Sequence, residues 1–100
     1  MRIPIHPGEI LGEELDELGL DVTDLARILA VPVDDITQIL NGHERVTGEF
    51  AMRLSRWLGT SPQFWLNLQN SYELRLAAQT VGEEIERSIT PRSGIPPEAA

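Results

Sequence analysis

Apolar residues recur three or four positions apart along most of the chain, whereas strict alternation of apolar and polar residues is almost absent. The first spacing is typical of amphipathic helices and the second of half-buried strands. The pattern therefore predicts an all-α protein, a compact bundle of five helices. The number becomes six if the last helix breaks near Gly82.

Short signals mark where each helix begins and ends. They are proline at a first helical position, a capping residue before it, and glycine after the last turn. The predicted helices run from Pro7 to Gly19, from Asp21 to the corner Ala30–Pro32, from Val33 to about Leu40, from Thr47 to Gly59, and from Ser61 through Val81. The last stretch, residues 91–100, is rich in proline and small residues, so we expect one domain over 1–90 and a disordered tail over 91–100.

The second and third helices, with the corner between them, fit a helix-turn-helix. This motif needs a small residue where the helices cross and apolar residues on both inward faces. Ala26 meets the first need. The inward residues are Leu25, Leu29, Val31, Ile36 and Ile39. Ala30 is expected at the left-handed position of the corner, where alanine costs about 1 kcal/mol relative to glycine.

Helical geometry turns a second set of residues in the third helix outward. That set is Val33, Asp34, Thr37, Gln38 and Asn41. The Gln38 amide suits a bidentate pair with adenine, and Thr37 suits a base or a phosphate. Arg45, with His43 two residues before it, follows the helix and is positioned to hold a phosphate. We take these seven residues as the candidate DNA-binding site.

The charge of the chain argues against the simplest form of this interpretation. The protein has a net charge of −8, whereas a nucleic-acid binder normally presents a basic face. The charge is uneven, with −7 over residues 1–42, +1 over 43–65 and −2 over 66–100. All of the positive side chains are arginines, which favour bidentate contacts with phosphate or carboxylate. The acidic first helix would also suit a basic protein partner.

Two aspartates, Asp34 and Asp35, open the predicted reading helix. Their main interpretation is capping, because carboxylates in a first turn satisfy free amides and the positive end of the helix dipole. A second interpretation is that Asp34 accepts from a cytosine amino group. A third is that both repel phosphate and weaken DNA binding.

Several other functions lack support in the sequence. No cysteine is present, and His6 and His43 have no neighbouring ligands, so we expect no metal site and no cofactor. His6 is instead expected to organise the start of the first helix. No spacing supports a catalytic set, so we do not expect an enzyme. No apolar run approaches the roughly 18 residues of a membrane helix, and no secretory signal is evident, so we expect a cytoplasmic protein without membrane contact.

The fifth predicted helix carries large apolar residues at helical spacing. They are Trp65, Leu68, Tyr72 and Leu76. A core or a dimer contact explains such a stripe better than a cofactor site does. We expect two copies to pair through this helix. A dimer would contact DNA twice, which compensates for the few basic residues of each copy.

Three stretches together resemble the HigA-type antitoxins, within the larger Xre/Cro-type helix-turn-helix group. They are "HPGEILGEELDELGL", "DLARILAVPVDDITQILNG" and "RVTGEFAMRLSRWLGTSPQFWLNLQNSYELR". The resemblance covers about residues 5–76, and "HPGEIL" and "LGTSPQFWLNLQ" are its most specific segments. It implies a lambda-repressor-like fold.

The resemblance also implies a function. Proteins of this kind are similar to dimeric repressors that bind the promoter of their own operon, and their partner is a HigB-like toxin, a ribonuclease that cleaves messenger RNA on the ribosome. The base-reading positions fall on Val33, Asp34, Thr37 and Gln38. Asp35, where relatives often carry arginine or a neutral polar residue, and Val22, where related repressors often carry a phosphate-binding polar residue, depart from the pattern.

Two functions therefore follow from the sequence. The leading one is a DNA-binding antitoxin that represses its own operon and neutralises a HigB-like toxin. The alternative is a protein-interaction module with a degenerate helix-turn-helix, which binds a toxin or another partner but little DNA. A repressor that responds to a small molecule is less favoured, because no ligand chamber is evident in so short a chain.

Overall fold

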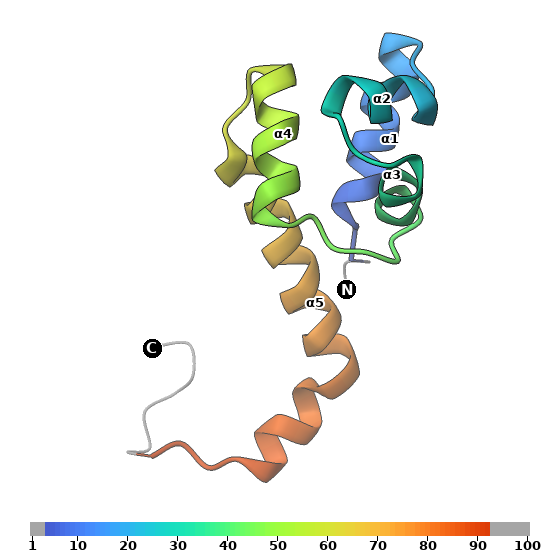
Figure 1. The fold of residues 1–100 in the computed structure, drawn as a ribbon. Coiled ribbons are helices and arrows are strands. Elements are labelled where there is room, and N and C mark those ends of the chain that lie inside the picture. Colours follow the sequence, from blue (N-terminus) through green and yellow to red (C-terminus); the bar gives the residue numbers. More distant parts are fainter. Residues whose placement is uncertain (1–3, 93–100) are drawn as a thin grey trace.

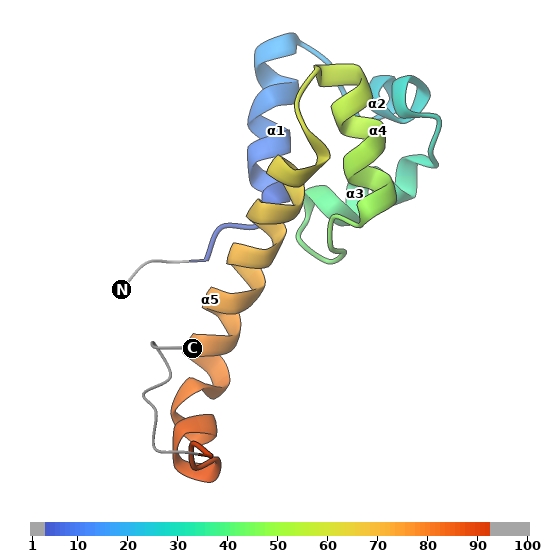
Figure 2. The same cartoon turned by 90° about the vertical axis from the view of Figure 1, so that its left-hand side faces the viewer.

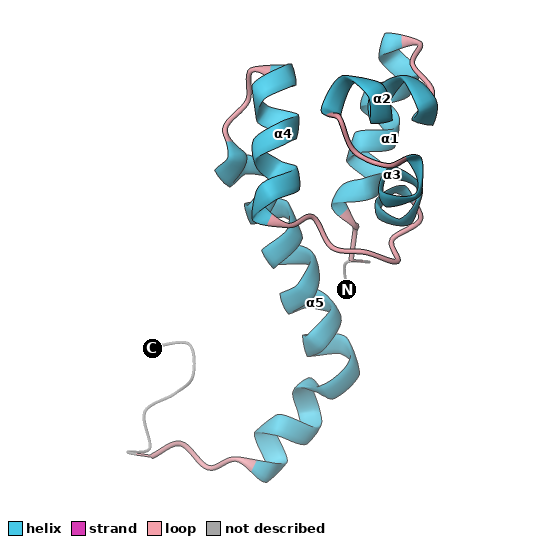
Figure 3. Ribbon diagram, viewed as in Figure 1, coloured by secondary structure: helices cyan, strands magenta, loops and turns pink. Residues whose placement is uncertain are grey.

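The computed structural model describes residues 4–92, and within that range it contains helices and loops but no strand (Figure 3). The five helices are α1 (Pro7–Leu18), α2 (Val22–Leu29), α3 (Val33–Leu40), α4 (Gly48–Leu58) and α5 (Pro62–Ser88). Helices α1–α4 form a head, and α5 starts against it and extends away as an arm (Figures 1 and 2). The all-α prediction with five helices is confirmed. Helix α5 continues unbroken past Gly82, so the described residues contain no sixth helix.

The core of the head includes four of the five residues predicted to face inward in the helix-turn-helix, and the fifth, Val31, is half-buried against it. The members of the core are Leu11, Leu15, Leu25, Ala26, Leu29, Ile36, Ile39, Val46, Phe50, Ala51, Leu54 and Trp65. Leu18, in the last turn of α1, is 49% exposed and does not belong to this core.

The second half of α5 makes the molecule less compact than expected. From residue 73 to 88 every position is exposed except Gly82, which is half-buried. The inward stripe of α5, which includes Trp65 and Gln69, ends near Tyr72. Beyond that point the helix has nothing of the head to pack against. The tail expected over 91–100 lies outside the described residues, apart from Pro91 and Arg92.

The start of α1 is fixed by His6, as expected from the sequence. His6 is the N-cap, and its Nδ1 accepts from the Gly8 amide at 2.9 Å. Its own amide donates to Glu9 Oε2 at 3.1 Å, which completes a capping box. The imidazole is buried and meets the Tyr72 ring edge-on, with 4.9 Å between ring centroids. Burial lowers the pKa of His6, and a hydrogen bond with the Glu44 backbone and the charge of Glu9 only partly oppose that shift.

Helix α1 then packs closely on α3. A methyl group added at Gly8 would collide with the carbonyl oxygen of Ile39. Only glycine allows this approach, so the first turn of α1 sets the position of the C-terminal end of α3. Together with the His6 cap, this contact orients α3 on the head.

The corner between α2 and α3 has the predicted left-handed residue. Ala30 has φ 57° and ψ 48°, and it is the one residue other than glycine with positive φ in the described part of the chain. Arg53 of α4 supports the corner, since its Nη1 donates to the carbonyl oxygens of Leu29 at 2.8 Å and Ala30 at 3.4 Å. These carbonyls belong to the C-terminal end of α2, where they need donors.

A buried amide joins α5 to the head. Gln69 Oε1 accepts from the Val46 amide at 2.7 Å, just before α4 begins. Both groups are buried, so losing either partner would leave the other unsatisfied. The described helices include none that has both the length and the apolar character needed to cross a membrane.

We predict that Ala30→Gly stabilises the protein by about 0.5–1 kcal/mol, because glycine adopts the left-handed conformation without steric cost. Urea denaturation at a fixed protein concentration measures the change. Ala77→Gly is the matched control, because Ala77 lies inside helix α5, where glycine is unfavourable. An unchanged or lower free energy of unfolding for Ala30→Gly would contradict the proposed strain.

We also predict that stability falls as the pH drops below about 6.5, the ordinary pKa of histidine. The folded protein keeps His6 neutral because its pKa is lowered by burial, whereas the unfolded chain takes up the proton. The unfolded state then binds more protons, so the free energy of unfolding decreases with falling pH. Protonation also removes the Nδ1 acceptor from the Gly8 amide.

Denaturation series at pH 8, 7, 6 and 5.5 test this prediction. His6→Asn retains a capping acceptor without a titrating ring, so its stability should vary less over this range. His43→Asn removes the other histidine and should keep the dependence of the parent protein. Equal slopes for the parent and His6→Asn would show that His6 is not the group responsible.

Candidate nucleic-acid interface

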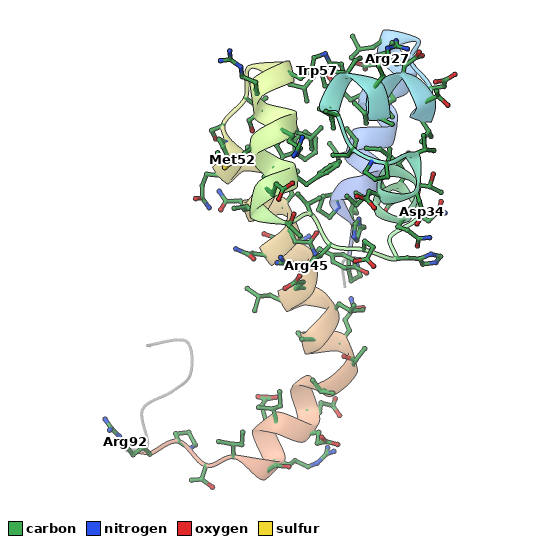
Figure 4. All side chains as sticks on the ribbon, in the orientation of Figure 1. Arg27, Asp34, Arg45, Met52, Trp57 and Arg92 are labelled. Carbon is green, nitrogen blue, oxygen red and sulfur yellow. The ribbon has the colours of Figure 1, made fainter. Side chains whose placement is uncertain are left out.

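Helix α3 lies at the surface of the head with one face on the core. Ile36 and Ile39 are buried, while Val33 is 45% exposed. Of the other predicted residues of this helix and its end, Asp34 and Asn41 are exposed and Thr37 and Gln38 are half-buried. Figure 4 shows Asp34 projecting from the outer side of α3. The structure thus brings the predicted residues of α3 together on one outward strip.

The polar side chains of this strip differ in which hydrogen-bond donors and acceptors they leave free. The Thr37 hydroxyl donates to the Val33 carbonyl oxygen at 3.1 Å, so it faces solvent mainly as an acceptor. Among the described residues, no hydrogen bond engages the side-chain amide of Gln38. Gln38 therefore has both a donor and an acceptor available, which is what a bidentate contact with adenine requires.

Backbone hydrogen bonds to Gln38 hold the loop after α3. The carbonyl oxygen of Gln38 accepts from the amides of His43 at 2.9 Å and Glu44 at 3.2 Å. His43 and Arg45 are exposed in this loop. These two bonds fix the position of His43 and Glu44 relative to the outward strip of α3.

The capping interpretation of Asp34 and Asp35 is wrong as a statement about hydrogen bonds. The N-cap of α3 is Pro32, and it provides no side-chain cap. In the described residues neither aspartate carboxylate bonds an amide of the first turn. Both lie near the positive end of the helix, where a negative charge is favourable. Their carboxylates remain exposed to whatever approaches α3.

A groove of about 400 Å³ lies beside the strip, between α3 and the start of α4. Its lining includes the carboxylates of Asp34, Asp35, Glu44 and Glu49, against one arginine, Arg53. A cavity with this charge repels phosphate. A DNA backbone near α3 must therefore be held by groups outside the groove.

Three arginines of α2, α4 and the loop after α3 pair with carboxylates of the same chain. The pairs are Arg27 Nη2 with Asp24 Oδ1 at 3.4 Å, Arg45 Nε with Glu73 Oε2 at 2.9 Å, and Arg53 Nη2 with Glu49 Oε2 at 3.1 Å. Figure 4 shows Arg45 where the loop after α3 reaches α5. Local pairing thus reduces the positive charge that the sequence places over 43–65.

Sequence reasoning missed three polar residues that position this region. They are Arg53, which binds the end of α2, Gln69, which binds the loop before α4, and Glu73, which holds Arg45. Gln69 had a detectable signal, because it falls on the inward stripe of α5 between Trp65 and Tyr72. Arg53 meets Leu29 and Ala30, and Glu73 meets Arg45, across more than 20 residues of sequence, and no local pattern indicates these contacts.

The predicted dimer residues do not share one environment. Trp65 is only 2% exposed and belongs to the core of the protomer, so it has no free surface for a second copy, and we correct that assignment. Leu68 and Tyr72 are half-buried, and Tyr72 uses one ring edge on His6. Leu76 is 40% exposed on the arm.

The two histidines lie in different places and hold no common site. His6 caps α1, and His43 is in the loop after α3. Among residues 4–92, no group of three His, Asp or Glu side chains is arranged to hold a metal ion.

Comparison with known proteins gives relatives along nearly the whole chain, although no family model matches it. An uncharacterized HTH-type transcriptional regulator of Escherichia coli, YddM, is 41% identical over 93 residues, which are 90% of this chain and 99% of the relative. An addiction module antidote protein of the HigA family from Coxiella burnetii is 48% identical, with a TM-score of 0.86 over 91% of this chain and 99% of that one.

A third relative has been solved with DNA. It is the Pseudomonas aeruginosa antitoxin HigA with the higBA promoter, which is 41% identical, with a TM-score of 0.86 over 90% of this chain and 99% of that one. The resemblance inferred from the three sequence stretches is thereby confirmed. The chain belongs to the HigA family of antitoxins, within the helix-turn-helix transcriptional regulators.

Proposed function

We propose that this protein is the antitoxin of a toxin–antitoxin pair. It binds operator DNA in the promoter of its own operon as a dimer, represses that operon, and neutralises a HigB-like ribonuclease toxin. It acts as a regulator and not as an enzyme, and it does so in the cytoplasm, where a promoter and a ribosome-directed toxin are both found. Membership of the HigA family supports this assignment, as does the relative solved with its promoter.

The observation that carries DNA binding is the outward strip of α3. Gln38 offers an unengaged amide, and Val33 offers an exposed apolar surface for a thymine methyl group. Asn41, His43 and Arg45 follow within a few residues and are exposed, as phosphate contacts must be. Base contacts give sequence preference, while the loop contacts give orientation on the duplex.

The proposed dimer forms through α5. Of the four residues predicted for the seam, Leu68, Tyr72 and Leu76 have surface available for a second copy. Two α3 helices would then enter successive major grooves, with half-sites about 34 Å apart or a multiple of that distance. Doubling the contacts compensates for the small number of arginines on each protomer.

Toxin neutralisation rests on the acidic face of the head. Helix α1 carries Glu9, Glu13, Glu14, Asp16 and Glu17. A ribonuclease needs positive charge to hold RNA, so a face of this kind would attract it and speed association.

The acidic groove and the paired arginines favour the second candidate function, an interaction module that binds little DNA. A gel-shift titration on the upstream DNA at two salt concentrations separates the two. Binding that prefers the operator over random DNA of equal length supports the antitoxin-repressor. An absent or sequence-independent shift supports the interaction module.

We predict that Gln38→Ala weakens operator binding by about 1–3 kcal/mol and relaxes the preference at one base pair, because a bidentate base contact is lost. Fluorescence anisotropy with operators substituted at single positions measures both effects. Gln63→Ala, on an exposed residue at the start of α5, is the control and should behave like the parent. If Gln38→Ala weakened binding to every sequence equally, the base-reading role would be wrong.

We further predict that Leu76→Glu shifts the protein toward monomer and lowers operator affinity, since it buries a charge in the proposed seam. Sedimentation velocity gives the oligomeric state. Leu74→Glu makes the same change at a position that is more exposed and two residues away. If Leu74→Glu separated the dimer and Leu76→Glu did not, the seam would lie on another face of α5.

A further inference from the structure

Arg45 and Glu73 form the pair that lies nearest to both the reading helix and the arm. Arg45 Nε donates to Glu73 Oε2 at 2.9 Å, and about half of each side chain is exposed, 49% and 45%. The pair joins the loop after α3 to the point where α5 leaves the head (Figure 4). Arg45 is also the arginine closest in sequence to the reading strip.

Glu73 is itself fixed in position. Gln69 Nε2 donates to the same oxygen, Glu73 Oε2, at 2.9 Å, and Gln69 Oε1 accepts from the buried Val46 amide. A continuous hydrogen-bonded chain thus runs from the backbone beside Arg45, through Gln69, to the carboxylate that holds the Arg45 side chain. The hydrogen bond from Arg45, and then the one from Gln69, lower the pKa of Glu73, so the carboxylate is charged at neutral pH.

A carboxylate oxygen that accepts from an arginine Nε occupies the place that a phosphate oxygen takes in a DNA complex, because both anions use the same donors. On the basis of the function proposed above, we propose that Glu73 is an internal competitor of the DNA phosphate for Arg45. When the protein binds DNA, Arg45 leaves the carboxylate and donates to the backbone. Glu73 is left with Gln69 as its partner.

The exposure of the pair makes this exchange feasible. Ion pairs between exposed side chains are weak, because water and salt screen them. Breaking the Arg45–Glu73 pair therefore costs little free energy. That cost nevertheless lowers the affinity of every DNA complex in which Arg45 contacts a phosphate. Because phosphate contacts carry no sequence information, Glu73 lowers affinity for all DNA by the same factor.

This role would explain why Arg45 is paired with a carboxylate of its own chain. An unpaired Arg45 would raise binding to any duplex, whereas a paired one leaves the base contacts of α3 to supply more of the affinity. The protein then needs the operator, and not just DNA, to reach useful occupancy. Glu73 thus limits affinity without contacting the DNA.

The test is the binding of the full chain to operator and to random duplexes, with Glu73→Gln in the parent and in an Arg45→Ala background. Glutamine keeps an acceptor for Gln69 and removes the charge that holds Arg45. We expect Glu73→Gln to tighten binding to both duplexes about two- to fivefold, and to have no effect once Arg45 is alanine. Glu83→Gln is the matched control, because Glu83 has a similar pair with Arg87 on the distal arm, with 3.8 Å between Arg87 Nη1 and Glu83 Oε2.

Three results would overturn the inference. They are unchanged or weaker binding by Glu73→Gln, an equal gain in the Arg45→Ala background, and an equal gain from Glu83→Gln. The second and third would mean that general repulsion, and not competition, is removed. Failure of the parent protein to prefer its operator would instead contradict the proposed function. A shift of the Arg45 Nε–H signal in NMR spectra when DNA is added gives an independent measure that needs no variant, and an unmoved signal contradicts the exchange.

Discussion

The contact between the first turn of α1 and the end of α3 is the constraint on which the rest of this structure depends. Gly8 allows the backbone of α1 to reach the Ile39 carbonyl, and the His6 cap fixes the direction from which α1 approaches. Because His6 also contacts Tyr72, the same joint places α5. One buried histidine therefore contributes to the placement of both α3 and α5.

Polar contacts then fix the parts of the head that apolar packing leaves adjustable. Arg53 holds the end of α2, and Gln69 holds the loop before α4. Each contact joins segments that are more than 20 residues apart, and each satisfies backbone groups that a short loop leaves open. The segment that contains α3 is thereby tied to α4 on its N-terminal side and to α5 on its C-terminal side.

An acidic protein of this family faces a balance between recognising DNA and being repelled by it. Here Arg27, Arg45 and Arg53 are paired with carboxylates of the same chain, and Asp34 and Asp35 add exposed negative charge at the start of α3. Such a surface gains little from the DNA backbone, so base contacts matter more for affinity. The pairing therefore lowers affinity for every duplex, while the preference for the operator over random DNA is set by the base contacts.

The sequence alone determined the five helices, the caps of all but α3, the helix-turn-helix and the left-handed Ala30, because these depend on local spacing and on the backbone preferences of single residues. It also identified the outward strip of α3, since helical period fixes which residues share a face. Only the tertiary structure decided that Trp65 belongs to the core, that α5 outruns the head, and that Arg45 is held by Glu73. These facts depend on contacts between segments that are distant in sequence. Local spacing of residues does not indicate which distant side chains will meet in the folded protein.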